Sequence, residues 1–236
     1  MIIAFAGQKG GIGKSTTAIS VAVAAHDRGM RVLLVDADPQ GTVRTWADVA
    51  SEAGHTTPTV VAMGATMHKA GQLTSIAATY DLTIIDCPPR HGDIQRSALM
   101  VADLVVLPSG PSAADAWALA AALDVVKEAQ ILRDELTACI LITRKQGGTA
   151  LAKSARKVLE SSGLRVLKSE LGYRVAYQEA LALGRGVTSL ARARSSRTAP
   201  RDAAADEVFH LLAELETYAH GQEASRGFTP QAAAAG

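Results

Sequence analysis

IIAFAGQKGGIGKST, residues 2–16, places an apolar run, a glycine-rich loop and a potential helix start in direct succession. Glycines in such a loop let consecutive backbone N–H groups turn toward one anion. Lys14 adds a cation for the β and γ phosphates of a nucleotide, and the Ser15 hydroxyl can ligate magnesium. The stretch therefore predicts a nucleotide phosphate site.

The spacing of this loop departs from the common G-x-x-x-x-G-K-[ST] pattern, because Gln8 stands where that pattern has its first glycine. The match is to K-G-G-x-G-K-[ST], and here the sequence resembles the deviant Walker A motif of the ParA/MinD family of ATPases. The resemblance implies that ATP and Mg²⁺ are the cofactors and that Lys9 reaches across a dimer interface to the partner's phosphates. The residues it assigns to ATP are Lys9, Gly10, Gly11, Ile12, Gly13, Lys14, Ser15 and Thr16, with Lys9 and Lys14 also counted as catalytic.

Short apolar runs alternate with longer helical stretches along the chain. We expect strands at 2–6, 32–35, 82–85, 104–107, 140–142 and 166–167, and an extra short strand at 59–63. Helices are expected at 14–28, 42–53, 93–101, 113–134, 150–162 and 203–217, where apolar residues recur at helical spacing. This alternation predicts an α/β fold, a single-domain P-loop NTPase whose mostly parallel, twisted sheet has helices on both faces.

Carboxylates follow two of the expected strands directly. Asp36 and Asp38 come after the strand at 32–35, and Asp86 comes after the strand at 82–85. Ligand sites of parallel sheets form at the carboxyl ends of the strands, so these groups are expected beside the phosphate loop. By resemblance to the family's switch segments, Asp36 and Asp86 support magnesium together with Ser15, and Asp38 orients the attacking water. An isolated strand-end Asp is equally common as a turn or helix-capping residue.

Two further segments continue the resemblance. Pro111 lies in a proline-containing stretch before an expected helix, and Thr143 and Arg144 follow the strand at 140–142, where the family contacts the nucleobase. The resemblance assigns all three to ATP binding. The short chain, the P-x-x-P spacing and the T-R-K triplet are most similar to the small ParF-like ParA partition proteins.

Composition favours one cytoplasmic domain. The chain has 236 residues, of which 48% are apolar, enough for one core, and we expect the domain at 1–220 and a flexible tail at 221–236. Cys87 and Cys139 show neither a metal-ligand spacing nor a disulfide framework. Residues 1–6 lack the basic region of a signal peptide, and no apolar run approaches the roughly 20 residues that span a bilayer. The first strand is expected at residue 2, so no operator-reading helix-turn-helix is expected ahead of it.

The net charge of +1 conceals a basic segment. From Lys153 to Arg201 there are eleven Lys or Arg and three Glu, a local balance of 11 − 3 = +8. Such a segment can contact DNA phosphates, although solvated basic faces are common. The candidate DNA-binding residues are Arg174, Arg185, Arg192, Arg194 and Arg197.

The resemblance implies a ParA-type ATPase that forms an ATP-sandwich dimer, binds DNA nonspecifically on the nucleoid and partitions plasmid or chromosome DNA. A ParB-like adaptor would stimulate its ATP hydrolysis. The alternative is a related ATPase that positions a protein cargo, such as a carboxysome or chemoreceptor cluster.

Other members of the superfamily fit less well. A MinD-like regulator needs a terminal amphipathic helix for the membrane, which the tail does not offer. A nitrogenase iron protein needs cluster thiolates, for which the two cysteines are badly placed. A dethiobiotin synthetase is not excluded by motif alone, although the D-P-Q and D-x-P-P segments point away from it.

Overall fold

The computed structural model describes residues 1–90, 92–146, 156–194 and 202–226. In these residues seven strands form one sheet in the order β3-β2-β4-β1-β5-β6-β7, and every neighbouring pair is parallel. The strands are β1 (Ile2–Phe5), β2 (Val32–Asp36), β3 (Thr59–Ala62), β4 (Leu82–Asp86), β5 (Leu104–Ser109), β6 (Thr137–Lys145) and β7 (Arg165–Gly172). The expected α/β class and the extra strand near residue 60 are confirmed.

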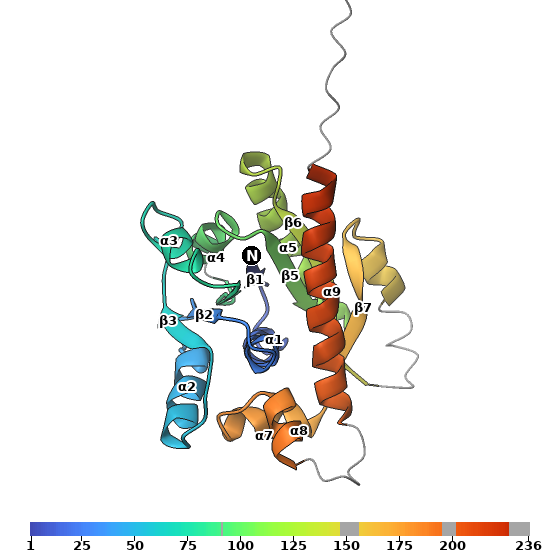
Figure 1. The fold of residues 1–236 in the computed structure, drawn as a ribbon. Coiled ribbons are helices and arrows are strands. Elements are labelled where there is room, and N and C mark those ends of the chain that lie inside the picture. Colours follow the sequence, from blue (N-terminus) through green and yellow to red (C-terminus); the bar gives the residue numbers. More distant parts are fainter. Residues whose placement is uncertain (91, 147–155, 195–201, 227–236) are drawn as a thin grey trace, which may run out of the picture.

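Helices cover both faces of this sheet (Figure 1). One face carries α1 (Lys14–Asp27), α2 (Thr42–Glu52), α7 (Val175–Ala182), α8 (Val187–Arg194) and α9 (Ala203–Arg226). The other carries α3 (Leu73–Ala77), α4 (Gly92–Leu99) and α5 (Ala113–Leu132). The strands β2, β4 and β5 are apolar along most of their length because both of their faces are buried, whereas β3 at the sheet edge has no buried residue.

Side chains of β1 show how the two layers divide. Ile3 and Phe5 are fully buried in the core beneath α1 and α9, whereas Ala4 is buried in the core beneath α4 and α5. This alternation follows from the two-residue period of a strand. β1 lies between β4 and β5, so the loop that follows it opens at the middle of the sheet edge.

The second half of the chain contains helices that we did not predict. Helices α7 and α8 are only eight residues each and lie in the basic, glycine-containing segment, where no long apolar period exists. The short α3 was also missed. Strand β7 extends well beyond the two residues expected for it. Of the helix expected at 150–162, residues 156–160 are helical, and residues 147–155 lie outside the described part.

Helix α9 is longer than the sequence suggested. It runs to Arg226, so the expected boundary between domain and tail at residue 220 falls inside a helix. Residues 227–236, the rest of the expected tail, lie outside the described residues. Among the residues that are described, no helix combines the length and hydropathy needed to cross a bilayer.

Candidate nucleotide and switch site

The loop between β1 and α1 has the geometry expected of a phosphate cradle. Gly11 and Gly13 have φ angles of 71° and 90°, a left-handed conformation that other residues rarely adopt. Gly13 is also the N-cap of α1, which begins at Lys14. A Cβ placed on Gly10 or Gly11 would meet nothing within 4 Å, so open space lies in front of the loop. The backbone N–H groups and the helix terminus can therefore receive an anion.

Both lysines of the loop are engaged within the chain. The Lys14 ammonium donates to the Lys9 carbonyl oxygen at 3.0 Å, and burial lowers the pKa of Lys14 although Asp86 acts in the opposite direction. The Lys9 ammonium lies 2.6 Å from the Asp115 carboxylate of α5. Burial opposes ionisation of Asp115, but hydrogen bonds from Lys9 and Ser112 outweigh it and hold the pKa of Asp115 below its usual value. Lys9 is thus held against its own subunit.

Two of the predicted carboxylates meet at the sheet edge. Asp36 and Asp86 are direct register partners at the ends of β2 and β4. Asp36 accepts hydrogen bonds from the Asp38 and Arg44 backbone N–H groups, at 3.2 and 3.0 Å, and from Arg44 Nε at 3.2 Å. Asp36 is therefore already well supplied with donors, and Arg44 is a contact that the sequence did not reveal.

Asp86 differs, because neither of its buried carboxylate oxygens has a hydrogen-bond partner among the described residues. Burial raises the pKa of Asp86 to about 7, while the nearby Ser15 hydroxyl and the Lys14 ammonium act against this rise. An unpartnered buried carboxylate is costly unless a cation or donor satisfies it.

The donor set fits a magnesium ion. No group of three or more His, Cys, Asp or Glu side chains that could hold a metal is found in the described part of the chain. Mg²⁺ in nucleotide sites needs no such cage, since it keeps several waters and takes phosphate oxygens with one or two protein ligands. Asp86 and Ser15 offer such a set beside the phosphate loop.

Asp38 is buried and acts as a turn residue close to Asp86. Its carboxylate accepts from the Gln40 N–H at 2.9 Å and its carbonyl from the Gly41 N–H at 2.9 Å, so it forms the turn into α2. It also lies near enough to contribute to the raised pKa of Asp86. The turn therefore holds the carboxylate at the site.

A cavity of about 460 Å³ adjoins the phosphate loop on the side of β6 and β7. The two predicted base-contacting residues line it and support the loop: Thr143 Oγ1 donates to Ile12 O at 2.8 Å, and Arg144 Nη1 donates to Gly11 O at 2.9 Å. The Arg144 guanidinium also lies 5.6 Å from the centre of the Tyr173 ring. Gly11, Gly13, Thr16, Tyr173, Arg174, Tyr177 and Gln178 complete most of the lining.

Tyr173, Tyr177 and Gln178 were not predicted, since single polar or aromatic residues after the last strand carry no motif. Pro111, which was assigned to ATP, is not among the residues that line this cavity. It precedes Ser112, the N-cap of α5, on the side where Lys9 meets Asp115.

Four of the five candidate DNA-binding arginines lie in the described residues, and they do not all line the same cavity. Arg174 lines the cavity beside the phosphate loop and pairs with Glu207 at 2.6 Å. Arg192 pairs with Asp27 at 3.3 Å and Arg194 with Glu179 at 3.1 Å. Arg197 lies outside the described residues.

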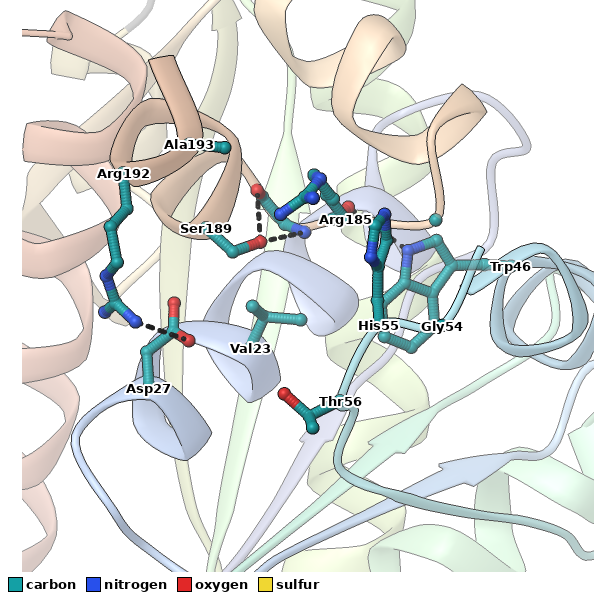
Figure 2. A pocket seen from close by; sticks show the side chains of 12 residues that line it. Val23, Asp27, Trp46, Gly54, His55, Thr56, Arg185, Ser189, Arg192 and Ala193 are labelled. Carbon is teal, nitrogen blue, oxygen red and sulfur yellow. Dashed lines mark hydrogen bonds and ion pairs between the residues drawn. The ribbon is translucent and has the colours of Figure 1, made fainter. Parts of the chain in front are cut away.

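Arg185 and Arg192 line a second cavity of about 330 Å³ between α1, α8 and the segment after α2. Figure 2 shows the Arg192–Asp27 pair on one side of it and Arg185 with His55 on the other. Within the described residues, the Arg185 side chain has no ion-pair partner.

Two glycines fix the position of Arg185. A Cβ on Gly184 would lie 2.5 Å from backbone atoms of Ala50, and one on Gly186 would lie 2.7 Å from the Val23 side chain. The Arg185 carbonyl also accepts from Trp46 Nε1 at 3.1 Å. The turn therefore packs tightly on α1 and α2 and presents the arginine from a rigid base.

The fold and site together define a P-loop nucleotide-binding domain. A family model described as "CobQ/CobB/MinD/ParA nucleotide binding domain" matches residues 3–187, and the chain belongs to this family. The resemblance to ParA/MinD proteins is thereby confirmed.

Curated relatives include proteins with different cargo. The chain is 30% identical to the maintenance of carboxysome distribution protein A of Halothiobacillus neapolitanus, over 90% of this chain and 95% of that protein. It is 32% identical to the chromosome-partitioning ATPase Soj of Thermus thermophilus, over 94% and 97%.

Solved structures share the fold. An ATP complex of McdA from Cyanothece aligns with a TM-score of 0.70 at 18% identity, over 93% of this chain and 96% of that chain. MinD from Pyrococcus horikoshii, complexed with Mg-ADP, aligns with a TM-score of 0.69 at 18% identity, over 94% and 98%.

Proposed function

We propose that this chain is a ParA-type ATPase that dimerises around ATP, binds DNA nonspecifically and distributes a cargo over the nucleoid. One observation carries the proposal: the buried Asp86 carboxylate has no partner among the described residues and lies beside a phosphate loop with Ser15 and two lysines. This arrangement suits a nucleotide with a divalent cation better than it suits a structural turn.

We assign each residue of the site a separate role in ATP binding and hydrolysis. Loop N–H groups from Gly10 to Thr16 bind the phosphates, and Lys14 leaves the Lys9 carbonyl to bind them as well. Ser15 and Asp86, with Asp36 behind them, would hold Mg²⁺, which supplies positive charge to the phosphate oxygens. Asp38 orients the attacking water, and Lys9 reaches the phosphates of the partner subunit. Thr143 and Arg144, which also support the loop, contact the base.

The relatives differ in the cargo that their names give. Similarity to a chromosome-partitioning Soj and to a carboxysome-distribution protein is comparable in identity and extent. We propose DNA partition with a ParB-like adaptor that stimulates hydrolysis, and positioning of a protein cargo is the second candidate. In both cases the protein works in the cytoplasm on the nucleoid, without a membrane.

The mechanism can be tested by multi-angle light scattering with ATP and Mg²⁺, with ADP, and without nucleotide. We expect a dimer only with ATP for the wild type, no dimer for Lys9→Ala, and a persistent dimer with impaired phosphate release for Asp38→Ala. A wild type that stays monomeric with ATP, or a Lys9→Ala variant that dimerises equally well, would contradict the sandwich dimer.

For DNA we propose that the relevant cations are Arg185, Arg192 and Arg194, on α8 and the turn before it. Changing all three to Gln should weaken ATP-dependent retention on duplex DNA and flatten its salt dependence by about 0.9 in log–log slope for each lost phosphate contact. ATP binding should stay unchanged. Arg96→Gln is a matched control, because Arg96 is also exposed and ion-paired but lies on α4. Equal salt slopes for the triple variant and the control would remove these arginines from the proposal.

The two cargo candidates can be separated by the adaptor. A small basic or ribbon-helix-helix protein encoded next to this chain, if it stimulates hydrolysis and binds a specific DNA site, would support partition. Stimulation by a protein that binds a protein shell or receptor array instead would support the second candidate.

A further inference from the structure

Gln95 of α4 is a buried polar side chain at the boundary between the phosphate loop and the segment that follows Asp86. It is 1% exposed. Its amide nitrogen donates to Pro88 O at 2.6 Å and to Gly7 O at 3.3 Å, and its amide oxygen accepts from Gln8 Nε2 at 3.2 Å. One side chain of α4 thus joins the segment after β4, seven residues before it, to the phosphate loop, 88 residues before it at Gly7.

The position of these bonds matters because the sheet ends just before them. The Cys87 N–H donates to Phe5 O at 3.0 Å, and this is the last backbone hydrogen bond between the β1 and β4 segments. Beyond it, no backbone hydrogen bond among the described residues joins the loop at 7–13 to residues 88–90. Beyond that point, the Gln95 amide connects the two segments through its hydrogen bonds to Gly7 and Pro88.

The chemistry of the amide suits such a link. Both amide protons and the amide oxygen are used, so a buried group that would be costly without partners is satisfied. A carboxylate at the same place would face the Gly7 and Pro88 carbonyl oxygens without a proton to donate. A leucine would fill the space and leave both carbonyl oxygens without this donor.

The linked segment also contains a residue in an unfavourable backbone conformation. Arg90, two residues after Pro88, has a φ angle of 60°, which is unfavourable for a residue with a Cβ. A connection that fixes Pro88 therefore helps to maintain strain close to Asp86. Movement of Gly7 and Gln8 would be passed on to Pro88 and to α4.

We infer that Gln95 is a positioning residue that couples the phosphate loop to the Asp86 segment, so that nucleotide bound on one sets the geometry of the other. The inference rests on the proposed ATPase function. Gln95 would act through its bonds to Gly7, Gln8 and Pro88 and not by contact with the nucleotide. The sequence around it carries no motif that would have identified it.

The test compares Gln95→Leu with Gln130→Leu. Gln130 is a matched control because its amide donates to a backbone carbonyl, Leu136 O at 2.9 Å, just before β6 and away from the site. For Gln95→Leu we expect kcat to fall about tenfold to a hundredfold, the scale of a small misplacement of catalytic groups, with the KM for ATP changed less than threefold. ATP-induced protection of residues 86–99 from hydrogen exchange should be lost. Gln130→Leu should keep both.

A second variant guards against a folding defect. Gln8 is half-buried, and Gln8→Ala removes only one of the three bonds. It should lower kcat in the same direction by a smaller factor, and it should add nothing to Gln95→Leu in the double variant. A folded Gln95→Leu with wild-type kcat and exchange protection, or additive effects of the two changes, would overturn the coupling. Absence of hydrolysis in the wild type would instead refute the proposed function.

Discussion

Replacing Asp115 with Asn should make the chain dimerise with ATP at lower protein concentration. Lys9 lies 2.6 Å from Asp115 in the single chain, and in the proposed dimer it must leave this carboxylate to reach the partner's nucleotide. The change removes the charge that holds Lys9. It keeps an oxygen that can accept from the Ser112 N–H, now at 3.1 Å, so the start of α5 is preserved.

The size of the effect follows from the exposure of the pair. The Lys9 side chain is 35% exposed and that of Asp115 is 7% exposed, so solvent weakens the attraction and we take about 1 kcal/mol for the pair. A dimer releases two such pairs, which amounts to about 2 kcal/mol. At about 1.4 kcal/mol per tenfold, the dimer dissociation constant should fall about 30-fold.

Sedimentation equilibrium with ATP and Mg²⁺, in the Asp38→Ala background to prevent turnover, measures this constant directly. Asp124→Asn is the control, since Asp124 is exposed on the same helix. With Lys9→Ala added, neither the Asp115→Asn protein nor the protein that keeps Asp115 should dimerise, because both lack the lysine that reaches the partner subunit. An unchanged or weaker dimer in the Asp115→Asn protein would refute the idea that this pair restrains Lys9.

Three further predictions concern stability and reactivity. Gly184→Ala should lower the free energy of unfolding, measured in urea, by about 3 kcal/mol, because a Cβ there overlaps Ala50 and φ is 61°. Gly29→Ala is the control and should lower it by about 1 kcal/mol, since φ is 88° but the space around it is open. Equal losses for the two variants would contradict the tight packing of Gly184. Hydrogen bonds from Arg31 lower the pKa of Asp81 to about 2, so their stabilising effect is complete above about pH 4 and is lost as the pH falls toward 2. Asp81→Asn should remove this loss of stability when the free energy of unfolding is measured between about pH 4 and about pH 2, whereas Asp48→Asn, at an exposed site, should leave it in place. Burial raises the pKa of both thiols, so Ellman's reagent at pH 8 should label Cys87 and Cys139 only after unfolding, and rapid labelling of the folded chain would contradict their burial.

The sequence predicted the parts of the site that depend on adjacent residues. The loop between Phe5 and Lys14 has its conformation because of local glycines, and Asp36 and Asp86 meet because parallel strands end at one edge. Such features are contained in short segments and in the rules of parallel sheets. They needed no knowledge of packing.

What the sequence did not predict depends on contacts between distant segments. Lys9 was expected at a partner subunit, and its contact with Asp115, 106 residues away, has no local signature. Arg174 was grouped with Arg192 by composition, but the turn after β7 carries it to the nucleotide side. Gln95 and Arg44 bond to the site through side chains whose direction follows from tertiary packing alone.

The central place of β1 has a consequence for how the chain folds. Ile3 pairs with Ile84 on one side and with Leu104 on the other, so this strand acquires neither neighbour until a long stretch of later sequence is available. Until then its two edges remain open to other chains. We expect slow folding with a transient risk of aggregation, as is typical of sheets built from distant parallel strands. The phosphate loop, attached to this strand, is fixed in place only when β4 and β5 have closed around it.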